Sequence, residues 1–154
     1  MMDTMSRTAP AVAWRLWVMR LLALAGLGVS GYLTWTHLTN QAIMCGGSQE
    51  CDLVQQSVYS EVLGIPVALL GMLAYATLLA LMFLHVRLPE AWDAYIPLAI
   101  FGISLIGVLY SAYLTYLEIY VIYAICRWCV SSAVIITAIF LLSLPDLRAG
   151  ADLP

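Results

Sequence analysis

The sequence predicts an all-α integral membrane protein: a four-transmembrane-helix bundle with an extracytoplasmic cysteine-bearing loop between the first two helices. The first observation is composition, since 64% of the 154 residues are hydrophobic and only 10% are charged, whereas soluble domains average roughly 25% charged residues. The second is the presence of four long stretches without Asp, Glu, Lys or Arg. The third is the placement of arginine, almost all of it on one side of those stretches. We expect a single membrane domain covering residues 1–154.

The four predicted helices lie at residues 15–38, 62–86, 94–120 and 126–145. Each is near the roughly 20 residues that a helix needs to cross the hydrocarbon core. Helices are the default because backbone groups in lipid must bond within their own segment. Pro66 and Pro97 fall in the first turns of the second and third helices, where a missing N–H costs little. The first apolar run is too long for a cleavable signal peptide, so we expect it to be retained.

Arginine placement predicts the orientation. All six basic residues are arginine, and five of them lie on the same side of an even number of spans. Those five are Arg7, Arg15, Arg20, Arg87 and Arg148. Because positive residues concentrate on the cytoplasmic side, we expect both termini to be cytoplasmic in a multi-pass protein. The net charge of −3 leaves no basic patch for nucleic acid.

The chain has four cysteines, in two pairs. Cys45 and Cys51 lie in the predicted loop between the first two helices, and Cys126 and Cys129 form a CxxC motif that opens the fourth. Both pairs then lie on the extracytoplasmic side, where disulfides persist. A helix N-terminus stabilises a thiolate, and the thiolate is the species that attacks a disulfide. Two dithiol pairs on one face therefore predict electron transfer by thiol–disulfide exchange.

Other interpretations of the four cysteines stay open. They would suit two purely structural disulfides, although the two cysteines of a CxxC are closely spaced for an ordinary structural disulfide. A zinc site built from all four is less expected, because such sites usually lie in closed polar folds with two similar knuckles, and we expect no metal. A small four-helix transporter or scaffold with structural disulfides is the non-enzymatic alternative. A transporter would usually carry a charge at mid-span, and the four charge-free stretches have none.

The motifs resemble those of bacterial-type vitamin K epoxide reductase (VKOR) homologues, across roughly residues 15–145. The matching elements are Cys45, Cys51-Asp52, Ser57, Leu63-Gly64-Ile65-Pro66 and Cys126-Arg-Trp-Cys129-Val-Ser-Ser-Ala133. The resemblance implies four helices around a quinone (ubiquinone or menaquinone) in the bacterial inner (plasma) membrane. It also implies a thiol:quinone oxidoreductase that drives disulfide bond formation. Many relatives are fused to a thioredoxin-like domain. None occurs in the sequence given, so we expect a separate periplasmic thioredoxin-fold (DsbA-like) partner.

The resemblance also implies an electron path. The partner would reduce the Cys45–Cys51 disulfide, meeting Cys45 first. Cys51 would attack Cys126, and Cys129 would then reduce the quinone. Two related activities are alternatives. A DsbB-type disulfide oxidase pairs the same chemistry with a CxxC after its first span, unlike this chain. A vitamin K epoxide/quinone reductase of the animal type carries a tyrosine where this chain has Ala133.

Further residues are candidates for the quinone pocket. Ser57 matches a serine of the family. Leu63 lies at the mouth of the second helix, while Ile122 and Ala133 lie one turn before and one turn beyond the CxxC. We expect Glu118 to be a solvated helix end, and the alternative is that this carboxylate near the membrane edge supplies a proton to the quinone.

Overall fold

The computed structural model describes residues 3–87, 92 and 95–151. Within them, four long helices form the bundle: α1 (Asp3–Thr39), α3 (Val67–Leu84), α4 (Tyr95–Leu117) and α5 (Arg127–Ala151). Short elements join α1 to α3: the helix α2 (Glu50–Gln55), the 3₁₀ turn η1 (Val58–Ser60), and the strands β1 (Glu61–Val62) and β2 (Ile65–Pro66). Beyond α4 the chain continues as a π-helical turn, η3 (Glu118–Ile122). The predicted fold class is confirmed.

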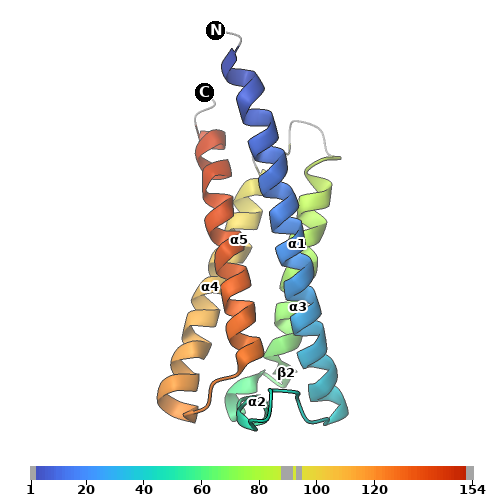
Figure 1. Cartoon of the computed structure of the whole chain (residues 1–154), viewed down its shortest axis with the longest axis vertical. Helices are drawn as coiled ribbons and strands as arrows, with labels where there is room; N and C mark the ends of the chain where they lie inside the picture. Colours follow the sequence, from blue (N-terminus) through green and yellow to red (C-terminus); the bar gives the residue numbers. More distant parts are fainter. Residues whose placement is uncertain (1–2, 88–91, 93–94, 152–154) are drawn as a thin grey trace.

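Four helical stretches of the described chain are long and apolar enough to cross a bilayer. They are Val12–Thr39, Val67–Leu84, Tyr95–Ile122 and Arg127–Arg148. In Figure 1, α1 begins and α5 ends at one end of the bundle, while α2 and β2 lie at the other. Helix α1 packs against α3 and α5, and α4 packs against α5 and α3. Both cysteine pairs therefore belong to the end of the bundle that is far from the chain termini.

Three helices differ from their predicted bounds by several residues, and the first of them, α1, begins at Asp3 rather than at residue 15. The second long helix begins at Val67 rather than at residue 62, because residues 61–66 form a tight antiparallel hairpin. Leu63 and Gly64 turn that hairpin with φ of 55° and 79°, a conformation that no helix continues through. The last helix runs past Pro145 to Ala151. An ion pair of 2.8 Å between Arg15 and Asp146 holds this extension against α1.

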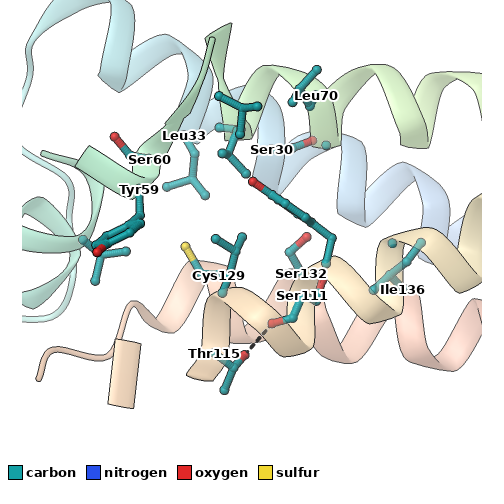
Figure 2. A pocket seen from close by; sticks show the side chains of 18 of the residues that line it. Ser30, Leu33, Tyr59, Ser60, Leu70, Ser111, Thr115, Cys129, Ser132 and Ile136 are labelled. Atoms are coloured by element: carbon teal, nitrogen blue, oxygen red, sulfur yellow. Dashed lines mark hydrogen bonds between the residues drawn. The ribbon is translucent and has the colours of Figure 1, made fainter. Parts of the chain in front are cut away.

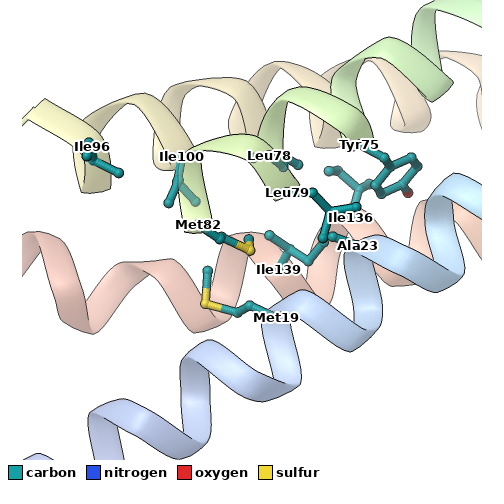
Figure 3. Close-up of a cluster of buried hydrophobic side chains, with 10 residues drawn as sticks. All are labelled: Met19, Ala23, Tyr75, Leu78, Leu79, Met82, Ile96, Ile100, Ile136 and Ile139. Atoms are coloured by element: carbon teal, nitrogen blue, oxygen red, sulfur yellow. The ribbon is translucent and has the colours of Figure 1, made fainter. Parts of the chain in front are cut away.

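The middle of the bundle is a buried apolar cluster to which all four long helices contribute (Figure 3). Its members are Met19, Ala23, Tyr75, Leu78, Leu79, Met82, Ile96, Ile100, Ile136 and Ile139. Close approach of α1 and α3 depends on Gly26, since a Cβ there would collide with the Tyr75 ring. The Tyr75 hydroxyl donates to the Ser132 carbonyl at 2.9 Å, so the same ring also ties α3 to α5. This cluster supports the end of the bundle that carries the cysteines.

Candidate functional site

The loop cysteines form a disulfide. Cys51 lies in the first turn of α2, and Cys45 lies in the preceding loop with its Cα 6.1 Å from that of Cys51. Gly46 and Gly47 have φ of 68° and 95°, so the turn between the two cysteines uses conformations that glycine adopts without strain. The Asp52 carboxylate accepts a hydrogen bond from the Ile43 N–H at 2.9 Å. The disulfide therefore sits in an ordered loop whose backbone is held by its own side chains.

The second pair is reduced and opens α5. Cys126 directly precedes the helix, and the Cys129 N–H donates to its sulfur at 3.4 Å, as in a helix N-cap. The hydrogen bond from the Cys129 thiol lowers the pKa of Cys126 below its usual range, burial opposes this, and the backbone N–H of Cys129 adds to the lowering. Cys126 is therefore the more activated thiol at the start of the helix, as the CxxC motif predicts.

Cys126 lies against the loop disulfide. Its side chain is buried in a cluster that also contains both loop cysteines, Leu33 and Ile43. Such a shared cluster brings the two redox pairs into one buried environment. The arrangement allows thiol–disulfide exchange between the loop and α5.

Cys129 instead faces an apolar cavity of about 420 Å³ (Figure 2). The wall comes from all four long helices and from the short elements α2, η1, β1 and η3. Most of the wall is aliphatic. The small polar side chains on it include Ser30, Ser60, Ser111, Thr115 and Ser132. A concave, mostly apolar volume with a few polar groups is typical of a small-molecule site.

Of the four predicted pocket residues, the structure brings two to the cavity. Ser57 and Ile122 line it, whereas Leu63 and Ala133 are absent from its wall. Leu63 is 98% exposed because it occupies the hairpin turn. Ala133 does not line the cavity because it lies off the face of α5 that does. That face carries Cys129, Ser132 and Ile136, at positions i, i+3 and i+7. Leu63 and Ala133 therefore lie outside this cavity, and quinone contact by either residue stays a prediction.

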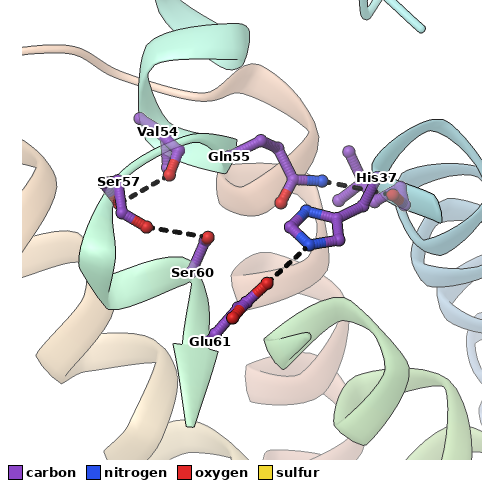
Figure 4. A network of polar contacts seen from close by, with 7 residues as sticks. His37, Val54, Gln55, Ser57, Ser60 and Glu61 are labelled. Atoms are coloured by element: carbon purple, nitrogen blue, oxygen red, sulfur yellow. Dashed lines mark hydrogen bonds and ion pairs between the residues drawn. The ribbon is translucent and has the colours of Figure 1, made fainter. Parts of the chain in front are cut away.

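Ser57 has a local role as well. Its hydroxyl donates to the Val54 carbonyl at 2.7 Å, and its own carbonyl accepts from the Ser60 hydroxyl at 2.8 Å (Figure 4). The Ser57 proton is thereby used within the turn that follows α2. Ser57 shapes the rim of the cavity and, with its proton engaged, offers only the acceptor lone pairs of its hydroxyl oxygen to a ligand.

Glu118 is the residue that sequence reasoning placed wrongly. It is only 3% exposed and lines the cavity, so it is no solvated helix end. One carboxylate oxygen accepts the Cys126 N–H at 3.0 Å, and the carboxylate also hydrogen-bonds the Cys129 thiol. The π-helical turn and the positive φ of Tyr123, 56°, swing the chain back over this carboxylate. A sequence signal existed, because Glu118 is the only charged residue between Asp93 and Arg127.

A polar groove adjoins the cavity on its outer side. There the His37 ring and the Glu61 carboxylate meet at 3.1 Å, joining the end of α1 to the hairpin, and the Gln55 amide donates to the Leu33 carbonyl at 3.2 Å (Figure 4). Gln55, Ser57 and Ser60 belong to the walls of both groove and cavity. In the part of the chain that the structure describes, no group of three or more His, Cys, Asp or Glu is arranged to hold a metal ion.

The chain was compared with models of known protein families. The model described as "Vitamin K epoxide reductase family" matches residues 17–144. That range contains all four cysteines and every residue that lines the cavity.

Proposed function

Because the chain belongs to the vitamin K epoxide reductase family, we propose that it is a thiol:quinone oxidoreductase that reoxidises a thioredoxin-fold protein and passes the electrons to a membrane quinone. The observation that carries the proposal is the placement of the CxxC pair. Cys126 is buried with the loop disulfide, while Cys129, one turn further, lines the apolar cavity. A CxxC pair with one sulfur beside the loop disulfide and the other on the cavity wall suits electron transfer from the loop to the cavity.

The loop pair receives the electrons. A thiolate of the reduced partner attacks Cys45, forms a mixed disulfide and releases the Cys51 thiolate. The partner's second thiol then closes the partner's own disulfide and frees Cys45. Both loop cysteines belong to the buried cluster, and Cys45 is the proposed point of attack because it is 5% exposed, between the exposed Met44 and Gly46, whereas Cys51 is fully buried.

The second exchange moves the electrons to α5. Cys51 attacks Cys126 of the oxidised CxxC and releases Cys129. Cys45 then attacks Cys51, which restores the loop disulfide and leaves Cys126 and Cys129 as thiols. Two electrons have moved, and the product has an oxidised loop with a reduced CxxC. The structure has the same pattern, with Cys45 bonded to Cys51 and the CxxC cysteines free.

The cavity suits a quinone ring. Its volume of about 420 Å³ falls within the roughly 300–1,000 Å³ of small-molecule sites, and its aliphatic walls match an apolar ring and the start of a prenyl tail. Ile122 and Ile136 offer apolar contact, while Ser57, Thr115 and Ser132 offer polar atoms. A bound quinone, ubiquinone or menaquinone, accepts two electrons and two protons. Cys129 supplies the electrons from the cavity wall as the Cys126–Cys129 disulfide closes.

The arginine bias supports the proposed setting. With both termini in the cytoplasm of a bacterial inner membrane, the cysteine end faces the periplasm, where a DsbA-like partner oxidises its clients. The net reaction converts a partner dithiol and a quinone into a partner disulfide and a quinol. The protein would thereby drive disulfide bond formation.

A direct assay tests this function. Detergent-purified protein is mixed with ubiquinone or menaquinone and a reduced thioredoxin-fold donor, and quinone absorbance is followed for the wild type and for Cys126→Ala. Loss of quinone absorbance in the wild type alone supports the proposal. A folded wild type that reduces neither quinone, even with dithiothreitol, would leave the cysteines as structural staples in a scaffold or transporter.

A further inference from the structure

Glu118 is a buried carboxylate that the electron path does not use. It is the only residue with a carboxyl or cationic side chain among the described residues that line the cavity. Burying a carboxylate is costly unless it is hydrogen-bonded, and inside a membrane protein an ionisable group is by default a candidate for function. Its position at the reacting sulfurs calls for a specific role.

The contacts of Glu118 place it next to the proton that must move. The Cys126 N–H fixes one carboxylate oxygen at 3.0 Å. The Cys129 thiol lies within hydrogen-bonding reach of both the Glu118 carboxylate and the Cys126 sulfur. The Cys129 thiol thus has two acidic neighbours, Glu118 and Cys126, and such interacting groups titrate as a coupled set. The neighbouring carboxylate of α2, Asp52, is engaged by the Ile43 N–H instead.

We propose that Glu118 is the catalytic base that takes the Cys129 thiol proton and delivers it to the quinone oxygen in the cavity. This inference rests on the proposed function. The step begins with a Cys126 thiolate, a Cys129 thiol, the Glu118 carboxylate and a quinone. The Cys126–Cys129 S–S bond forms and the S–H bond of Cys129 breaks. The electron pair and the Cys129 proton go to the quinone, the proton by way of Glu118, and a second proton comes from water.

A polar groove adjoins the other side of the cavity. The polar groove lined by His37, Asn40 and Glu61 shares the wall residues Gln55, Ser57 and Ser60 with the cavity. The second proton can therefore arrive from the aqueous face without crossing the apolar core. Glu118 serves the side of the cavity that carries the Cys129 sulfur.

The test begins with Glu118→Gln, which keeps a carbonyl oxygen for the Cys126 N–H but cannot carry a proton. With dithiothreitol as donor and a short-chain ubiquinone as acceptor, we expect a loss of about 100-fold in the rate of quinone reduction, the low end of general acid–base effects. The residual rate should rise with the concentration of buffer acid, which replaces the missing carrier. Glu118→Asp, which keeps a carboxylate, should fall between the wild type and Glu118→Gln.

The matched control is Glu50→Gln, which removes an exposed carboxylate that lines neither the cavity nor the groove and should keep the wild-type rate. A readout independent of activity is the infrared S–H stretch of the protein with the loop disulfide intact and the CxxC reduced. Loss of a carboxylate partner in Glu118→Gln should move this band to higher frequency, while Glu50→Gln leaves it in place.

The outcomes separate this inference from the proposed function. If the wild type reduces no quinone, the proposed function fails, and the inference fails with it. If the wild type is active and Glu118→Gln matches it in rate and buffer dependence, only the role of Glu118 is overturned. If Glu118→Gln does not fold, the comparison of Glu118→Asp with the wild type decides. A wild-type rate together with an unmoved S–H band in Glu118→Asp would count against the proposal.

Discussion

The Trp128 indole donates a hydrogen bond to the Met44 carbonyl at 3.0 Å, so a residue inside the CxxC motif holds the loop that carries the other redox pair. The same indole lies against the Tyr32 ring with 5.1 Å between centroids. The Tyr32 hydroxyl in turn accepts the Met44 N–H at 3.1 Å. Both backbone polar groups of Met44 are thereby bound by aromatic side chains of α1 and α5. The loop is docked where Cys51 and Cys126 share one cluster.

Loss of the Trp128 hydrogen bond should slow transfer between the two cysteine pairs. Trp128→Phe keeps an aromatic ring against Tyr32 but frees the Met44 carbonyl. With a thioredoxin-fold donor we expect quinone reduction to fall roughly fivefold, the equivalent of one hydrogen bond of about 1 kcal/mol. Dithiothreitol, which can reach the CxxC without the loop, should support the wild-type rate. Trp35→Phe, at an exposed indole near the end of α1, is the control, and equal rates for both variants would remove the docking role.

Cys126 should react as a thiolate at lower pH than an ordinary cysteine. Its pKa is lowered chiefly by the hydrogen bond from the Cys129 thiol. Alkylation of reduced protein, followed by mass spectrometry of the Cys126 peptide, should therefore persist below the free-cysteine pKa of about 8.5 and decline only through the lower folded value. In Cys129→Ala the profile should move to higher pH. An unshifted profile in that variant would show that Cys129 does not stabilise the thiolate.

The same shift has a stability consequence. Because the folded pKa of Cys126 lies below the unfolded one, the thiolate's contribution to stability is fully present above about pH 8.5 and is lost as pH falls through the folded pKa. The reduced wild type should accordingly lose more stability on acidification than reduced Cys126→Ala. Thermal unfolding in detergent over that pH range measures the difference.

Filling the cavity should weaken quinone binding without touching the cysteines. Ser111→Phe places a ring in the cavity, because the Ser111 side chain lines it. The substitution keeps the hydrogen bond from the Thr115 hydroxyl, because the acceptor is the backbone carbonyl of Ser111 (Figure 2). We expect a rise of tenfold or more in the KM for quinone, about 1.4 kcal/mol, with the donor-side reactions unchanged. Leu63→Ala is the control because Leu63 lies outside the cavity and should leave the KM unchanged. A rise in the Leu63 variant alone would restore the original expectation for that residue.

The contact between α1 and α3 should tolerate no side chain at Gly26. A Cβ there meets the Tyr75 ring, which is itself buried and bonded to Ser132. Gly26→Ala should cost about 1–3 kcal/mol, the usual range for overpacking a core. At Gly28, on the same helix, a Cβ meets nothing within 4 Å. Gly28→Ala should therefore unfold with the wild type, and equal stability of the two variants would argue against this helix contact.

The sequence predicted the bundle well because charge placement reports directly on membrane crossing. Four charge-free stretches and the arginine bias need no tertiary information, and neither does a CxxC at the start of a helix. The hairpin at residues 61–66 was not predicted because each of its strands has two residues, too few to show a period-two pattern. Its turn residues, Leu63 and Gly64, were instead assigned to a helix.

The cavity face was harder to predict for a physical reason. In a membrane protein, lipid-facing and interior-facing side chains are both apolar, so periodicity does not say which side of a helix turns inward. Ala133 and Ile136 are both apolar, yet only Ile136 lines the cavity. The burial of Glu118 was not predicted because it depends on a π-helical turn, and the sequence carries no signal that distinguishes this turn from α-helix.

The most direct test of the relay compares Cys45→Ala with Cys129→Ala, using dithiothreitol as donor and following quinone absorbance. If Cys45 serves only to receive electrons from the protein partner and Cys129 passes them to the cavity, Cys45→Ala will reduce quinone at close to the wild-type rate. Cys129→Ala will reduce none. Equal rates in the two variants would contradict the assignment of one cysteine to the loop side and the other to the quinone side.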